Sequence, residues 1–226
     1  MANIKFAGKI DGSSLPRIQK FFILGAKDIA EGTPIAIKND NTPTTTFDAD
    51  TKGMFGVTAR EYKSKADEFN PENGTSYVNV IVSPDAVYEL PLTKTVKAET
   101  SMNDGSITLT TTEFNNVAES LTGVSLKLIQ HGSNPSKNAI QIGEEHVISA
   151  YEVTTAGKLE LYFNATPAVT AGDEYLIVPH PGFDRLTIKN GDVVISTATA
   201  DKSYFTVVGC DTKKNVAYIK AKNYLA

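Results

Sequence analysis

Short runs in which apolar and polar residues alternate recur along most of the chain. Gly, Pro, Asn or Asp bound these runs, and many of their residues are β-branched or aromatic. Both features are typical of half-buried β-strands. The strands predicted in this way are 34–37, 76–82, 106–110, 125–129, 146–153, 158–163, 174–178, 192–196, 204–208 and 216–220. The pattern therefore predicts an all-β, mainly antiparallel protein.

The last two predicted strands are expected to pair as a hairpin. The segment 211–215 between them is polar and has a suitable length for a hairpin loop. We therefore expect residues 203–222 to form one antiparallel unit.

One segment has the periodicity of a helix. Its apolar residues fall at positions i, i+3, i+4 and i+7, which places them in a single stripe on a helix. These residues are Phe114, Val117, Ala118 and Leu121. Thr111 or Thr112 can cap the first turn, and Gly123 can adopt the left-handed conformation that ends a helix. We expect one short helix near residues 112–122 that covers a face or an end of a sheet.

A glycine followed by Asp, Thr or Ser and then by an apolar run recurs along the chain. The glycines of this motif are Gly32, Gly74, Gly105, Gly172 and Gly191. Glycine supplies the positive φ of a tight turn, and the polar residue bonds the turned backbone. The irregular spacing does not indicate a repeat protein, and β proteins commonly reuse such turns. The motif favours a barrel or sandwich over a parallel α/β fold.

A charged stretch of small residues at 94–104 separates two strand-rich regions. Domain boundaries commonly fall in such stretches, so we place one near residue 98. The predicted organisation is an N-terminal arm over 1–20, a β domain over 21–97 and a second β domain over 98–226. Each β domain is expected to be a small barrel or sandwich.

The first twenty residues differ in charge from the rest of the chain. They contain Lys5, Lys9, Arg17 and Lys20 against Asp11, a net charge of +3 in a chain of net charge −4. Gly, Ser and Pro in the same segment oppose regular structure. The segment is either a disordered terminus or an extended arm that lies on an acidic partner. In the second case the four cations are the candidate docking residues.

Composition narrows the classes of function. A chain of 226 residues with 41% hydrophobic residues is long enough to bury a core and too apolar for a disordered protein. A pI near 5.4 argues against nucleic acid as the main partner. No apolar run approaches the roughly 20 residues of a membrane helix. The single cysteine and the charged start are typical of a chain made in the cytoplasm without a secretory signal.

Motifs of common enzymes are missing from the chain. The sequence contains no Gly-x-Ser-x-Gly elbow, no Walker-type phosphate loop and no Gly-x-Gly-x-x-Gly after a strand. We interpret His131, His146 and His180 as surface turn residues, although a site assembled from distant His and carboxylate residues remains open. No catalytic residue, cofactor or metal is predicted.

Three segments follow one another in an order that is similar to a known family. Residues 25–37 contain a Gly-Thr-Pro strand, residues 53–59 a Phe-Gly-Val strand and residues 78–82 a Val-x-Val strand. In this order they resemble bacteriophage capsid decoration, or cement, proteins over about residues 20–92. Thr58 stands where that family usually has Ala. The resemblance implies a small β-barrel or tulip-like domain.

The resemblance also implies a function. It is that of a non-enzymatic virion protein, made in the host cytoplasm, that binds the outer surface of the capsid and bridges capsomers. The implied partners are the major capsid protein and further copies of the chain, for example in a trimer, with no nucleic acid, membrane or cofactor. A phage tail, neck or fibre component, or a receptor-binding β protein, shares the same profile. A hydrolase with scattered catalytic residues is a further alternative.

Overall fold

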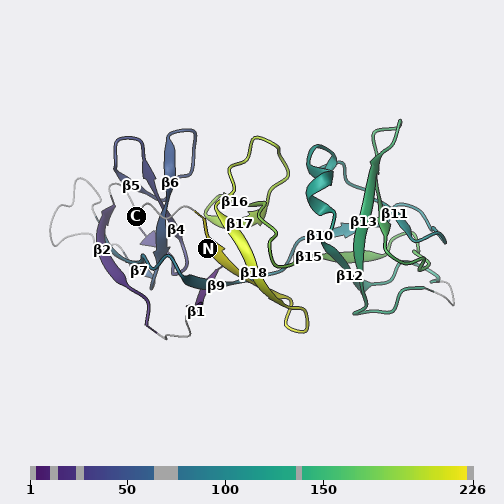
Figure 1. Ribbon diagram of the computed structural model, residues 1–226, viewed down its shortest axis with the longest axis horizontal. Helices are drawn as coiled ribbons and strands as arrows, with labels where there is room; N and C mark the ends of the chain where they lie inside the picture. The colour runs from purple at the N-terminus through teal and green to yellow at the C-terminus, as the bar shows by residue number, and fades with distance from the viewer. Residues whose placement is uncertain (1–3, 11–14, 24–27, 64–75, 136–138, 223–226) are drawn as a thin grey trace.

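The computed structural model describes residues 4–10, 15–23, 28–63, 76–135 and 139–222. In this part of the chain the strands form three antiparallel sheets and one short pair, and no sheet closes into a barrel. The sheets lie in a row along the long axis of the molecule (Figure 1). The all-β, mainly antiparallel prediction is confirmed, and a strand is present in each of the predicted strand segments.

The middle sheet combines strands from both ends of the chain. It contains β1 (Lys5–Lys9), β9 (Ala86–Pro91), β19 (Val216–Ala221), β18 (Phe205–Asp211), β16 (Leu186–Lys189) and β17 (Asp192–Ile195), in this order. Strands β9 and β19 alternate between buried and partly buried residues, so each turns one apolar face toward the core. The predicted hairpin is confirmed, because β18 and β19 pair antiparallel along their whole length.

The N-terminal sheet lies at one end of the row. It contains β2 (Ile18–Ile23), β8 (Ser76–Ile81), β6 (Thr51–Thr58), β4 (Pro34–Lys38) and β5 (Pro43–Thr44), in this order. A short pair accompanies it, made of β3 (Asp28–Ile29) and β7 (Tyr62–Lys63).

The distal sheet lies at the opposite end of the row. It contains β10 (Thr95–Lys97), β15 (Glu174–Val178), β12 (Ser125–Gln130), β13 (Glu145–Val153), β14 (Leu159–Phe163) and β11 (Ser106–Thr108), in this order. An isolated antiparallel bridge between Ala98 and Leu109 connects its two outermost strands. The sheet therefore curls until its edges approach each other.

The chain builds this row by two insertions into the middle sheet. The N-terminal sheet is inserted between β1 and β9, and the distal sheet between β9 and β16. Strand β9 pairs with β19 across the boundary that the sequence predicts near residue 98. Residues 186–221 therefore share a sheet with the first strand of the chain and not with residues 98–178. Local composition could not indicate this, because the pairing joins segments that are distant in sequence.

The described part of the predicted N-terminal arm over 1–20 belongs to the fold and is not separate from it. It contains β1, and its last residues begin β2. Ile4 is only 1% exposed, and the Phe6 ring lies edge-on to Tyr88 with 6.2 Å between ring centroids. An edge strand needs apolar side chains on one face only, so the charges on its other face concealed the strand pattern.

The predicted helix is present as η1, a 3₁₀ helix over Asn115–Leu121 with non-helical geometry at Val117. The apolar stripe is buried, and Gly123 has the expected positive φ of 85°. The expected cap is not found, because no side chain caps the helix; instead Thr111 Oγ1 accepts a hydrogen bond from the backbone of Glu113, before the helix begins.

The glycine motif behaves as predicted wherever the structure describes it. The motif glycines with positive φ are Gly32, Gly105, Gly172 and Gly191, and Gly74 lies outside the described residues. Gly105 shows why glycine is required, since a Cβ at this position would lie 2.1 Å from the carbonyl oxygen of Ala165. The motif thus marks turns at which the chain enters a strand.

One continuous apolar core connects the three sheets. Its buried members include Met54 from the N-terminal sheet, Tyr88 and Phe205 from the middle sheet and Leu126 from the distal sheet. The rings of Tyr88 and Phe205 pack edge to face with 6.4 Å between centroids. The sheets are therefore packed on one another and are not separate domains joined by flexible linkers.

Polar contacts fix the junction between the middle and distal sheets. Lys127 Nζ on β12 donates to the Thr212 carbonyl at 2.6 Å and to Asn215 Oδ1 at 2.9 Å, both in the turn of the β18–β19 hairpin. The Asn215 carbonyl also accepts from the backbone of Leu92 at 2.8 Å, in the segment that leads into the distal insertion. The hairpin turn therefore holds the distal sheet against the middle sheet.

Candidate docking surface

The predicted docking cations lie on two edge strands. Lys5 and Lys9 are on β1, which is the outermost strand of the middle sheet at that side. Lys20 is on β2 and Arg17 immediately precedes it, and β2 is an outermost strand of the N-terminal sheet. Edge strands carry backbone groups with no partner strand on one side, so they are natural sites of contact with another chain.

The connection from β8 to β9 brings these two strands together. Ile10 N donates to the Asp85 carbonyl at 3.1 Å, at the end of β1. At the start of β2, the Arg17 carbonyl accepts from Val82 N at 2.9 Å, and Arg17 N donates to Ser83 Oγ at 2.6 Å. Both strands therefore border the same short connection.

We use the name basic rim for the four cations of these two segments together with the exposed apolar residues next to them in sequence. It consists of Lys5, Lys9, Ile10, Leu15, Arg17, Ile18 and Lys20.

The cations of the basic rim differ in their exposure and in whether they form an ion pair within the fold. Lys9 Nζ forms an ion pair with Asp85 Oδ2 at 3.0 Å, and its side chain is 17% exposed. Lys5, Arg17 and Lys20 are exposed. Charges on such side chains are available to attract an acidic partner and to orient it during encounter.

Apolar side chains lie exposed among these cations. Leu15 is 82% exposed, Ile10 58% and Ile18 47%. The sequence pattern does not reveal them, because isolated apolar residues in a segment rich in Gly, Ser and Pro have no periodicity. Grouped exposed apolar side chains mark interaction surfaces. The basic rim can therefore combine electrostatic attraction with apolar burial in one contact.

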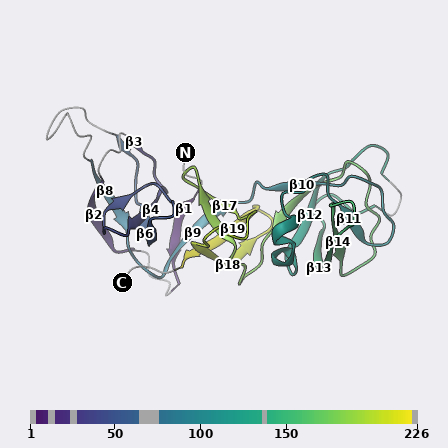
Figure 2. The ribbon, with the colours of Figure 1, turned by 90° about the horizontal axis from the view of Figure 1, so that it is seen from above.

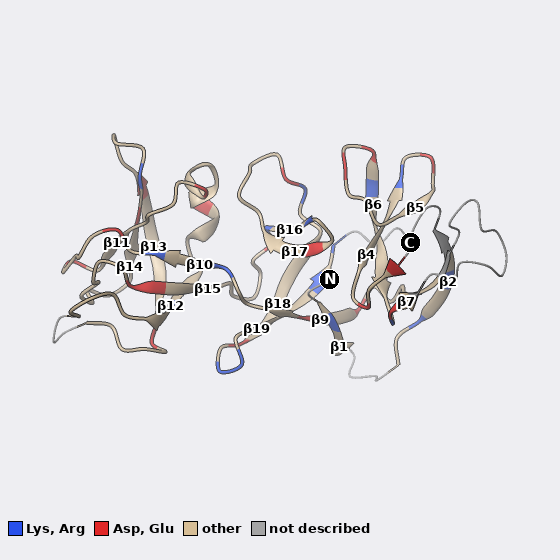
Figure 3. Ribbon diagram, turned by 180° about the vertical axis from the view of Figure 1, so that it is seen from behind, with Lys and Arg blue, Asp and Glu red and all other residues tan. Residues whose placement is uncertain are grey.

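Charge is distributed unequally along the molecule. Residues 95–178, which form the distal insertion, contain four Lys and ten Asp or Glu, a net charge of −6. The whole chain is −4, so the remaining residues sum to +2. Positions of acidic residues, coloured red on the ribbon, occur on η1 and on several strands of the distal sheet (Figure 3). The molecule thus has an acidic end and a basic rim near its middle and N-terminal sheets.

No known protein family, curated protein or solved structure matches this chain. Among the described residues no helix is both long and apolar enough to traverse a membrane.

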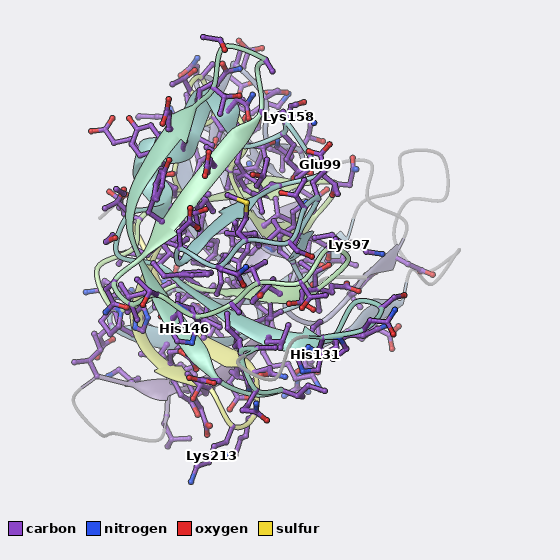
Figure 4. The ribbon with its side chains drawn as sticks, turned by 90° about the vertical axis from the view of Figure 1, so that its right-hand side faces the viewer. Lys97, Glu99, His131, His146, Lys158 and Lys213 are labelled. Carbon is purple, nitrogen blue, oxygen red and sulfur yellow. The ribbon has the colours of Figure 1, made fainter. Side chains whose placement is uncertain are left out.

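The three histidines lie in separate contacts. His131 Nδ1 is 3.4 Å from Asp173 Oδ1, His146 Nε2 is 3.2 Å from Glu144 Oε1, and His180 Nε2 is 2.6 Å from Ser125 Oγ. Figure 4 shows His131 and His146 near one end of the distal sheet, and Lys158 with its ion-pair partner Glu99 at the other end. Within the described ranges no three His, Cys, Asp or Glu side chains are grouped to hold a metal ion.

The contact between Ser125 and His180 has the residue types of a nucleophile and its base. Ser125 is only 1% exposed, which keeps its hydroxyl away from solvent. A cavity of about 400 Å³ adjoins His180 and is lined also by Gly123 and Arg185, but Ser125 does not line it. A substrate in this cavity would therefore not reach the serine oxygen.

A buried carboxylate that the sequence analysis did not single out organises the distal sheet. Asp173 has no exposed surface and accepts hydrogen bonds from Gly132 N at 2.8 Å, Thr170 N at 2.9 Å and the Tyr175 hydroxyl at 3.2 Å. Burial, together with the nearby charge of Asp173, raises the pKa of Tyr175 and keeps its hydroxyl protonated as a donor. Asp173 follows Gly172 in the glycine motif, and this position is the sequence signal that could have identified it.

Proposed function

We propose that this protein is a non-enzymatic structural component of a bacteriophage virion, which binds the outer surface of the capsid and bridges capsomers. The basic rim carries the proposal, because exposed cations, exposed apolar side chains and edge strands meet there. The resemblance of residues 20–92 to capsid decoration proteins supplies the identity of the acceptor. The cations Lys5, Lys9, Arg17 and Lys20 are the proposed docking residues.

The physics of a shell suits a surface of this kind. A capsid offers many identical acceptor sites, so interfaces of roughly 1,000 Å² each are sufficient when they are repeated. The basic rim would face an acidic patch of the major capsid protein, and the acidic distal insertion would face away from the shell. The protein would act as a homo-oligomer on the virion surface, a trimer being one such assembly, without nucleic acid, membrane or cofactor.

A phage tail, neck or fibre component, or a receptor-binding β protein, is the second candidate. The extended row of three sheets favours it, since such a shape can span a distance between two partners (Figure 2). The position of the protein on the virion separates the two candidates, because a tail or fibre component occupies a unique vertex and a decoration protein covers the shell.

Co-sedimentation with undecorated capsids tests the role of the basic rim. The variant K5E/K20E reverses two exposed rim charges and is expected to bind capsids at least roughly tenfold more weakly than wild type, about 1.4 kcal/mol. The control K213E/K214E makes the same change in net charge at the turn of the β18–β19 hairpin, where both lysines are exposed. It should bind as wild type does.

Equal binding by wild type and K5E/K20E would show that the basic rim does not contribute to capsid binding. Equal loss in the rim variant and the control would show that only net charge matters. Both results contradict the proposed docking surface.

A further inference from the structure

The β13–β14 hairpin is buried unequally on its two strands. Tyr151 is paired with Leu161 and Val153 with Leu159, and directly paired residues share one face of a sheet. Both leucines are 0% exposed, whereas Tyr151 is 41% and Val153 44% exposed. The apolar face that is covered over β14 is therefore uncovered over the end of β13.

The same end of β13 is an open sheet edge. Strand β12 pairs with β13 only as far as Val147, and every residue over 149–153 is exposed. On the far side of the hairpin, the Leu159 carbonyl accepts from Leu109 N at 3.0 Å, so Leu159 directs its backbone groups away from β13. In an antiparallel pair, its partner Val153 then directs its backbone groups away from β14, as does Tyr151 two residues earlier.

We call this surface, formed by Tyr151, Glu152 and Val153, the distal edge. It combines two apolar side chains with an exposed carboxylate, in an insertion of net charge −6. A partner that fits it is apolar, basic and extended. Another distal edge does not fit, because two regions of charge −6 repel each other.

The required chemistry is present elsewhere on this chain. Leu15 and Ile18 are exposed apolar residues at the start of the edge strand β2, and the exposed Arg17 lies between them. We propose that a second copy of the protein binds head to tail, with its segment Leu15–Ile18 lying along the distal edge. The apolar side chains of the two segments cover each other, and Arg17 of one copy lies next to Glu152 of the next.

This contact joins two different surfaces, so each copy can bind a neighbour at both ends. Such heterologous contacts produce closed rings where the rotation between copies allows closure, and open chains where it does not. The contact uses the segment Leu15–Ile18 of the basic rim, so a copy that binds a neighbour in this way cannot dock the same segment on a capsid. The inference therefore concerns the free protein, goes beyond the proposed function and is tested without capsids.

Two variants, each deficient in one surface, test the proposal by sedimentation velocity at low salt. Variant Y151S/V153S changes the distal edge and L15S/I18S changes the basic rim; all four side chains are exposed, so both variants should fold. Wild type at up to about 1 mM should self-associate, and the association should weaken as salt rises. Each variant alone should associate at least roughly tenfold more weakly.

The mixture of the two variants gives the decisive result. Y151S/V153S retains the rim and L15S/I18S retains the distal edge, so together they should form 1:1 heterodimers and nothing larger. The control I142S removes an apolar side chain that is 63% exposed elsewhere in the distal insertion, and it should associate as wild type does. A monomeric wild type, a mixture that stays monomeric, or one variant that self-associates fully would overturn the proposal.

Discussion

The outermost strands of the distal sheet are bridged to each other, whereas among the described residues the two rim strands, β1 and β2, each pair with one strand only. In the distal sheet, Thr110 N donates to the Lys97 carbonyl at 3.0 Å and Glu99 N to the Thr108 carbonyl at 2.8 Å, so the backbone groups of β10 and β11 are partly paired. At the rim, β1 and β2 each pair with a strand on one side only among the described strands. The distal sheet therefore has its two outermost strands partly paired with each other and stays open only along the end of β13, whereas the two rim strands are both outermost strands that can pair with a partner.

Polar side chains also differ between the distal insertion and the basic rim. In the distal insertion, the carboxylate of Asp173 is fully buried and its hydrogen bonds are made within the fold. At the rim, the ion pair of Lys9 with Asp85 accompanies three cations that are exposed. Substitutions of the buried polar groups in the distal insertion should therefore lower stability, and substitutions of exposed side chains at the rim should lower binding while leaving stability unchanged.

The largest effect on stability is expected at Asp173. Replacing it with Ala leaves the buried donors Gly132 N, Thr170 N and the Tyr175 hydroxyl without an acceptor, which should lower the free energy of unfolding by about 3 kcal/mol. Asp173→Asn retains one oxygen and should cost less. Urea unfolding of the full chain measures both. The free energy of unfolding of the rim variant K20E should stay within about 0.5 kcal/mol of the wild-type value. A larger change would show that the two regions do not differ in their contribution to stability.

Gly105→Ala should be the next most destabilising change. Its φ of 81° and the carbonyl oxygen of Ala165, 2.1 Å from an added Cβ, force the backbone to shift, at a cost of about 2–3 kcal/mol. Gly157→Ala is the matched control, because its φ is 76° but nothing lies within 4 Å of the added Cβ. It should cost about 1 kcal/mol. Thermal unfolding compares the two, and equal losses would show that the contact with Ala165 contributes nothing.

A smaller effect is expected where the distal sheet joins the middle sheet. Lys127→Met keeps the aliphatic part of the side chain but removes both hydrogen bonds to the β18–β19 turn, at a cost of about 1–2 kcal/mol. Lys214→Met in the same turn is the control, since the Lys214 side chain is 72% exposed. Denaturant unfolding should separate the two variants. If they unfold at the same concentration, Lys127 does not hold the junction.

The smallest expected effect is on the dependence of folding stability on pH. The side-chain and backbone hydrogen bonds of Ser106 lower the pKa of Asp104 in the folded protein. The stabilisation from this carboxylate is therefore complete above its unfolded pKa of about 3.9 and is lost as the pH falls through the lower folded value. Wild type should exceed D104N in stability at neutral pH, and the difference should shrink below about pH 4. A difference that is constant with pH would mean that the charge of Asp104 is irrelevant.

Local pattern was sufficient for the strands but not for their arrangement. The alternation over 216–220 predicts β19 correctly, yet nothing in it indicates that Ile219 pairs with Tyr88. The two strands are separated in sequence by the whole distal insertion. Contacts between such distant segments leave no periodic signal in either of them. The division into domains at residue 98 missed the shared sheet for the same reason.

The candidate surface was predicted only in part. Charge alone grouped the four rim cations, because Lys and Arg are recognisable without any periodicity. The exposure of Leu15 and Ile18 could not be read from the sequence, since an apolar residue is buried or exposed according to its neighbours in space. Likewise, the alternation over 146–153 predicts β13 but not that its pairing with β12 stops at Val147, opposite Ser125, the first residue of β12.

Electron microscopy of capsids incubated with an excess of this protein tests the central claim most directly. The account predicts saturable density at equivalent sites across the whole outer surface of the shell, with the basic rim toward the capsid and the acidic distal insertion away from it. Density confined to a unique vertex, or its absence from the shell, would contradict the account.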